Sequence, residues 1–120
     1  MNTSIKRLII ATGLSIALAG AVQAGSANYN KTVSNGQSWS GSWQLTVPSG
    51  ASFQTTVNAW GGSGGQVHVG NLTAGTTVYM LYFSSSNSVS GSDGPGTYQV
   101  SYLLGSTSGG SASASTTVTW

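Results

Sequence analysis

The sequence predicts an all-β protein: a single small antiparallel β-sandwich of about six or seven strands, immunoglobulin-like or jelly-roll-like. Three observations support this prediction. Short runs alternate between apolar and polar residues, turns rich in Gly, Ser and Asn separate the runs, and no amphipathic helix follows residue 24. Alternation with a period of two gives a strand one apolar face and one polar face. A series of such short runs is typical of sandwiches.

Residues 38–47 are the clearest strand. One face carries apolar residues or glycine at every second position, namely Trp39, Gly41, Trp43, Leu45 and Val47. Residues 51–59 repeat the alternation after Pro48-Ser49-Gly50. Two amphipathic runs joined by three turn residues predict a β-hairpin. We expect Trp39 and Trp43 to face the core.

Four further runs, residues 27–33, 66–69, 96–104 and 112–120, alternate in the same way. Residues 76–83 differ because both faces are apolar. Such a strand is either central and covered on both faces or lies against a second molecule. We interpret it as the core strand and expect a polar loop over residues 84–96. The last strand, which ends at Trp120, is expected at an edge of the sheet or donated to another copy.

The N-terminus has the features of a secretory signal peptide. Lys6 and Arg7 precede a short apolar run, and Val22-Gln23-Ala24 provides small residues for cleavage. We therefore expect residues 1–24 to be a cleaved signal peptide and residues 25–120 to be one β-sandwich domain. This predicts a protein that is secreted or displayed on the cell surface, with no integral membrane segment after cleavage.

Very few residues are charged, only 3%, whereas about a quarter are charged in an ordinary globular domain. After removal of the signal peptide only Lys31 and Asp93 remain. A surface this neutral offers no basic patch for phosphates, so we expect no nucleic acid partner. Charge also keeps sheet edges apart. The surface is therefore either a plain Ser/Thr/Asn exterior or one that tolerates self-association.

The same composition argues against catalysis. The mature chain has one carboxylate, Asp93, one imidazole, His68, and no cysteine. Glycoside hydrolysis needs a pair of carboxylates, and a zinc site needs several His or Cys ligands. We therefore predict a non-enzymatic protein with no catalytic residues, no metal site and no cofactor.

One strand resembles a strand of a known kind of module. Gly96-Thr97-Tyr98-Gln99-Val100-Ser101-Tyr102 is similar to a strand found in many bacterial β-sandwich modules, including pre-peptidase C-terminal domains. The resemblance covers that strand alone. The acidic residues that such modules often carry are missing, so it implies no site in this chain.

Two functions follow as hypotheses. The first is a bacterial surface or extracellular-matrix protein, structural or adhesive, that associates with other copies or related subunits by sheet-edge pairing or strand donation. Its self-association residues would be Thr116, Val118 and Trp120. The second is a monomeric carbohydrate-binding module or lectin. An exposed Trp60 would stack on the sugar, and its polar partners would be Asn58, Gln66 and Asp93.

Overall fold

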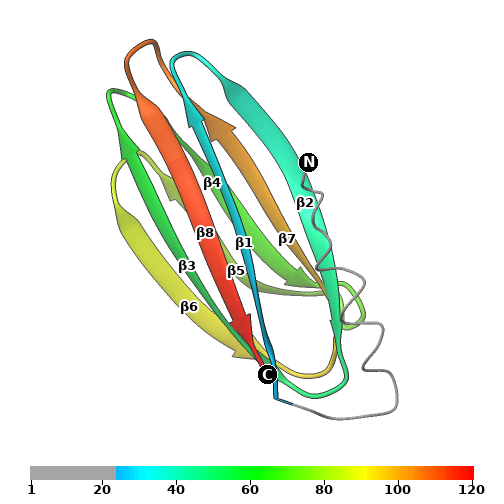
Figure 1. Cartoon of the computed structure of the whole chain (residues 1–120). Coiled ribbons are helices and arrows are strands. Elements are labelled where there is room, and N and C mark those ends of the chain that lie inside the picture. The colour runs from blue at the N-terminus through cyan, green and yellow to red at the C-terminus, as the bar shows by residue number, and fades with distance from the viewer. Residues whose placement is uncertain (1–23) are drawn as a thin grey trace.

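The computed structural model describes residues 24–120, which form two four-stranded antiparallel sheets (Figure 1). The strands are β1 (Ser26–Ser34), β2 (Ser38–Val47), β3 (Ala51–Trp60), β4 (Gly64–Asn71), β5 (Thr76–Phe83), β6 (Asn87–Asp93), β7 (Gly96–Gly105) and β8 (Ser111–Thr119). The predicted signal peptide lies outside the described residues, apart from Ala24. Within residues 24–120 no helix is long and apolar enough to cross a membrane.

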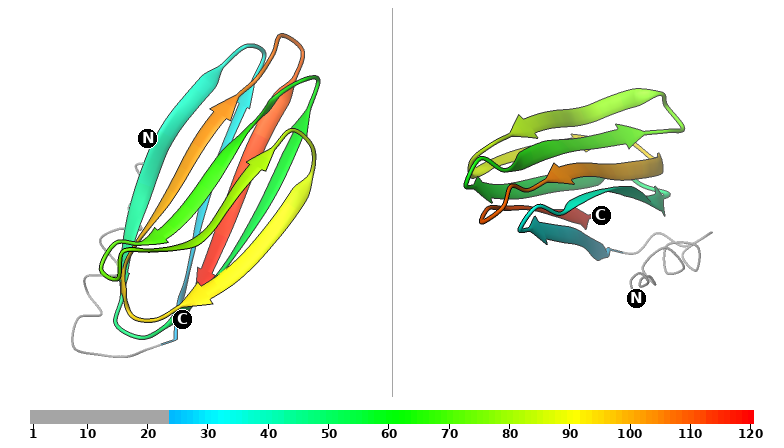
Figure 2. Two further views of the ribbon diagram at one scale, coloured as in Figure 1. Left: turned by 180° about the vertical axis from the view of Figure 1, so that it is seen from behind. Right: turned by 90° about the horizontal axis from the view of Figure 1, so that it is seen from above.

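The strand order is β1-β8-β3-β6 in one sheet and β2-β7-β4-β5 in the other. Consecutive strands alternate between the sheets, except that β4 and β5 are neighbours. This order is that of a jelly roll, an eight-stranded double sheet built from Greek keys. The predicted β-sandwich is confirmed in its jelly-roll form. Figure 2 shows the two sheets packed face to face.

The predicted hairpin of residues 38–47 and 51–59 is wrong. β2 pairs with β7 along its whole length, whereas β3 pairs with β8 and β6 in the opposite sheet. Pro48-Ser49-Gly50 therefore carries the chain from one layer to the other. Alternation tells which residues of each strand face inward, but it does not tell which strand each one pairs with.

The predicted polar loop of residues 84–96 contains the extra strand, β6, which pairs with β3 from Ala51↔Asp93 to Val57↔Asn87. Residues with small side chains fit β6 because the opposite sheet lies close to it. A Cβ atom on Gly91 would lie 3.0 Å from Cγ1 of Val78 in the opposite sheet. β6 is therefore a strand although its sequence has no apolar run, because its backbone pairs with β3 and its small residues allow the two sheets to approach.

The predicted positions of β5 and β8 within their sheets are both wrong, and the two are reversed. β5, expected in the centre, is an edge strand paired only with β4, and β8, expected at an edge, lies between β1 and β3. The inward residues of β8 are small, including Ala112 and Ala114, which are at most 2% exposed. Because these side chains are small, β8 can lie in the interior of its sheet, where the opposite sheet packs closely over it.

Aromatic rings fill the part of the core beneath β2. The Trp43 ring lies 5.3 Å from Tyr29, 5.2 Å from Tyr102 and 5.5 Å from Trp39, measured between ring centroids. Trp39 and Trp43 pack against the core as predicted. Both are only half-buried because β2 is an edge strand.

A chain of buried hydroxyl groups joins the two sheets. The oxygen–oxygen distances are 2.6 Å for Tyr79–Thr55, 2.7 Å for Thr55–Thr116 and 2.6 Å for Thr116–Tyr102, and Tyr102 lies 2.8 Å from the carbonyl oxygen of Tyr29. The Tyr102 hydroxyl donates in both of its contacts, to the carbonyl oxygen of Tyr29 and to the Thr116 hydroxyl, so these two acceptors share its single proton. Either partner can donate in the Tyr79–Thr55 and Thr55–Thr116 hydrogen bonds.

Candidate functional site

The four residues predicted for sugar binding do not form one site. Trp60, 58% exposed, ends β3, and Asn58 lies two residues earlier on the same outer face. Gln66 lies on the outer face of the other sheet, beside His68 and Leu103. Asp93 pairs with Ala51 at the opposite end of β3. The fold therefore brings together only Trp60 and Asn58, and Asn58 already accepts a hydrogen bond from Ser86 at 2.6 Å.

Asp93 links the β4–β5 connection to the β6–β7 connection by hydrogen bonds at one end of the sandwich. Its carboxylate accepts hydrogen bonds from the Thr76 hydroxyl at 2.7 Å, the Gly94 amide at 2.8 Å and the Asn71 side chain at 3.5 Å. The Thr76 bond, followed by the Gly94 bond, lowers the pKa of Asp93 below its ordinary value. Residues 24–120 hold no cluster of three or more His, Cys, Asp or Glu side chains that could bind a metal ion.

The residues predicted for self-association are not on a free edge. Thr116 and Val118 are completely buried, and their strand is paired on both sides. Trp120 follows β8 and exchanges two backbone hydrogen bonds with Gly25, at 2.7 and 3.0 Å. Its ring covers Gly25 so closely that a Cβ atom there would lie 2.6 Å away. The expectation that the last strand lies at an edge of the sandwich is therefore wrong.

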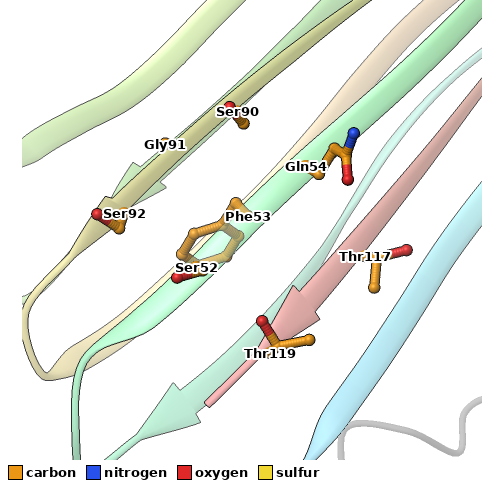
Figure 3. A pocket seen from close by; sticks show the side chains of 8 residues that line it. All are labelled: Ser52, Phe53, Gln54, Ser90, Gly91, Ser92, Thr117 and Thr119. Atoms are coloured by element: carbon orange, nitrogen blue, oxygen red, sulfur yellow. The ribbon is translucent and has the colours of Figure 1, made fainter.

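The outer face of the β1-β8-β3-β6 sheet is uncharged and hydrophilic. Its side chains are almost all Ser, Thr, Asn and Gln, and Trp60 is the exception. A shallow hollow of about 410 Å³ lies over β3, β6 and β8 (Figure 3). Its polar side chains are Ser52, Gln54, Ser90, Ser92, Thr117 and Thr119. This face offers neutral hydrogen-bonding groups and no group able to ionise near neutral pH.

The outer face of the β2-β7-β4-β5 sheet carries exposed apolar side chains. Tyr82 is 70% exposed, Leu103 56% and Met80 48%, and we call these three the apolar patch. Met80 and Tyr82 are neighbours on the outer face of β5, and Leu103 lies two strands away on β7, across Gln66 of β4 from Tyr82. Exposed large apolar side chains gathered on one face mark contact surfaces.

The sandwich has four open strand edges. β1 and β2 lie on one flank and β5 and β6 on the other (Figure 2). Lys31 lies on β1, with its Nζ 5.2 Å from the centroid of the Trp39 ring, and Asp93 ends β6. Charged side chains on edge strands oppose pairing with other chains. β2 and β5 carry no charge, and β5 is also apolar on both faces and carries two members of the apolar patch, so it is the least protected edge.

The sequence did contain a signal for this edge. Thr76–Phe83 is apolar on both faces, which allowed two interpretations: a strand covered twice or a strand lying against a second molecule. Its edge position rules out the first for the isolated domain. The exposure of Leu103 gave no such signal because β7 alternates like a half-buried strand.

No protein-family model matches the chain, and no curated protein has a similar sequence. Solved structures with a similar fold include a subunit of the Bacillus endospore appendages, described as disulfide-linked pili (TM-score 0.50, 10% identity, 84% of this chain and 90% of that chain). They also include the pre-peptidase C-terminal domain of a Bacillus anthracis collagenase (0.46, 11%, 71% and 90%) and a family 6 carbohydrate-binding module of the Zobellia galactanivorans laminarinase LamC (0.42, 15%, 80% and 100%). At these identities the likeness shows the β-sandwich fold alone.

Proposed function

We propose that this chain is an exported, non-enzymatic bacterial subunit, structural or adhesive, that assembles with other copies through its sheet edges. The observation that supports it is β5, an uncharged edge strand with Met80 and Tyr82 exposed on its outer face. An edge strand presents a row of unpaired N–H and C=O groups that another strand can bind. Export rests on the predicted signal peptide.

The lack of charge elsewhere supports the same function. Net charge and dispersed charged side chains keep domains soluble and apart. Residues 25–120 carry only Lys31 and Asp93, so copies approach one another without electrostatic repulsion. The sequence has no cysteine, so backbone pairing and apolar contact, without disulfides, would hold the assembly together.

The test compares two variants that add the same charge in different places. Met80→Lys puts a lysine on the edge strand β5, and Thr56→Lys puts one on the exposed face of the interior strand β3. Residues 25–120 are purified and followed by size exclusion and electron microscopy. We expect the wild type and Thr56→Lys to form large oligomers or filaments and Met80→Lys to stay small. A wild-type chain that remains monomeric at high concentration contradicts the function.

A second candidate function is binding of a neutral glycan by a monomer. The exposed indole of Trp60 favours it, since aromatic faces stack on sugar rings. Titration of the monomer with neutral polysaccharides should then shift tryptophan fluorescence, and Trp60→Ala should abolish the shift. An unchanged spectrum across the polysaccharides contradicts this function.

A further inference from the structure

The two edge strands of each sheet run in opposite directions. Each sheet holds four strands, and every neighbouring pair is antiparallel. β2 is therefore antiparallel to β5, and β1 is antiparallel to β6. A second copy moved sideways, and turned about that direction so that it continues the twist of the sheets, brings its β2 beside β5 of the first and its β1 beside β6. Both new pairs are antiparallel, so a single movement continues both sheets.

We propose that copies join in this head-to-tail way, flank β5/β6 of one against flank β2/β1 of the next. The inference rests on the proposed function and adds its geometry. Such a contact is heterologous and does not close on itself, so it generates an open filament. The partner is a second copy of this chain.

The open edges favour this arrangement over a two-fold one. The β1/β2 flank carries Lys31 and the β5/β6 flank carries Asp93, the two charged side chains of residues 25–120. The register places Asp93 level with Gly25, six residues along β1 from Lys31, so head-to-tail joining brings no like charges together. A two-fold contact between like flanks pairs one flank and leaves the other open.

Burial supports the same pairing. Half-buried apolar side chains line both flanks, with Trp39 and Trp43 on β2 and Val78 and Leu81 on β5. They pack against the core but remain partly in contact with water because the sheet stops beside them. A neighbouring β2 placed against β5 covers both sets at once, which removes apolar area from water.

The register of the single domain predicts which residues meet. Met80 pairs with His68, His68 with Ser101, and Ser101 with Ser42, so these four form one row across the sheet. The same sideways movement with its turn places Ser42 of the next copy beside Met80. Each copy adds four strands to each sheet, and strands lie about 4.8 Å apart, so the filament repeat is about 19 Å.

Cysteine cross-linking tests the geometry, because the native sequence contains no cysteine. Met80→Cys and Ser42→Cys chains are mixed, allowed to assemble and oxidised, with Thr56→Cys as the control on an interior strand. We expect a covalent heterodimer of the Met80→Cys and Ser42→Cys chains and no dimer with the control. The double variant Met80→Cys/Ser42→Cys should give a ladder of covalent oligomers. Ser40→Cys and Gln44→Cys detect a register shifted by two residues.

The outcomes separate this inference from the proposed function. Assembled chains in which Met80→Cys links to itself, or links to none of the three β2 positions, overturn the head-to-tail geometry and leave assembly standing. A wild-type chain that stays monomeric overturns both. Electron micrographs of filaments whose repeat is far from about 19 Å also overturn the geometry.

Discussion

β5 and β8 have similar lengths, eight and nine residues, yet they have opposite relations to the rest of the sandwich. β8 pairs on both sides, and its inward residues Ala112, Ala114, Thr116 and Val118 are at most 2% exposed. β5 pairs on one side and exposes Met80 and Tyr82. The small residues stabilise the monomer, whereas the outward large residues of β5 remain available for contact with another molecule.

The largest expected effect comes from a charge inside β8. Val118 is 0% exposed and faces the core, so Val118→Asp buries a carboxylate without a partner. We expect a loss of about 4 kcal/mol or more in the free energy of unfolding, enough to unfold much of the population. Far-ultraviolet circular dichroism and urea titration measure it. Tyr82→Asp on β5 is the matched control and should remain folded; a folded Val118→Asp variant of near wild-type stability contradicts the burial of β8.

The next effect concerns the hydroxyl chain that β8 contributes to the core. Thr116→Val removes the central hydroxyl, so Thr55 and Tyr102 each lose one of their two hydrogen bonds. Loss of buried hydrogen bonds of this kind costs about 1–3 kcal/mol. Thr116→Ser retains the hydroxyl and should lose less stability than the valine variant. Urea unfolding compares the two, and a valine variant at least as stable as the serine variant contradicts the chain.

The alternation of the sequence predicted the inward faces of β2, β3 and β8 because the side-chain period of a strand is a local property. Partners and edges are not local. Ser38–Val47 and Ala51–Trp60 are adjacent in sequence, yet their partners lie up to 67 residues away. Large apolar residues made Thr76–Phe83 look central, and a terminal position made Ser111–Thr119 look like an edge. Neither feature determines strand order.

The sequence predicts how little charge the surface carries, but not where the candidate residues lie. The near absence of charge follows from composition alone. The residues chosen for association, Thr116 and Val118, were wrong as an exposed edge because their strand is covered on both sides. Gln66 was grouped with Trp60 and Asn58 by residue type, whereas it lies on the outer face of the other sheet.

A moderate effect is expected at high pH. Burial raises the pKa of Tyr29 to about 12 and also raises the pKa of Tyr102, whereas an unfolded tyrosine ionises near pH 10. Below about pH 10 both states keep these protons and stability is constant. Between about pH 10 and 12 the unfolded state releases protons that the folded state retains, so the free energy of unfolding falls as pH rises.

Tyr29→Phe isolates one contribution to that fall. Within residues 24–120 the buried Tyr29 hydroxyl has no hydrogen-bond partner, so its removal should leave stability at neutral pH equal or slightly higher. The variant should also lose less stability than the wild type between about pH 10 and 12. Urea midpoints across the pH series measure both. A Phe variant that is clearly less stable at neutral pH contradicts the environment described for this hydroxyl.

The smallest expected change in stability comes from Tyr82→Thr on β5. Tyr82 is 70% exposed and threonine suits a strand, so the free energy of unfolding of the monomer should change by no more than about 0.5 kcal/mol. Assembly should nevertheless weaken because the apolar patch loses its largest member. Urea titration of dilute protein measures the first quantity and sedimentation velocity of concentrated protein the second. If stability fell by more than about 1 kcal/mol while assembly was unchanged, Tyr82 would belong to the monomer core. The contrast between β8, which stabilises the monomer, and β5, which contacts other copies, would then be wrong.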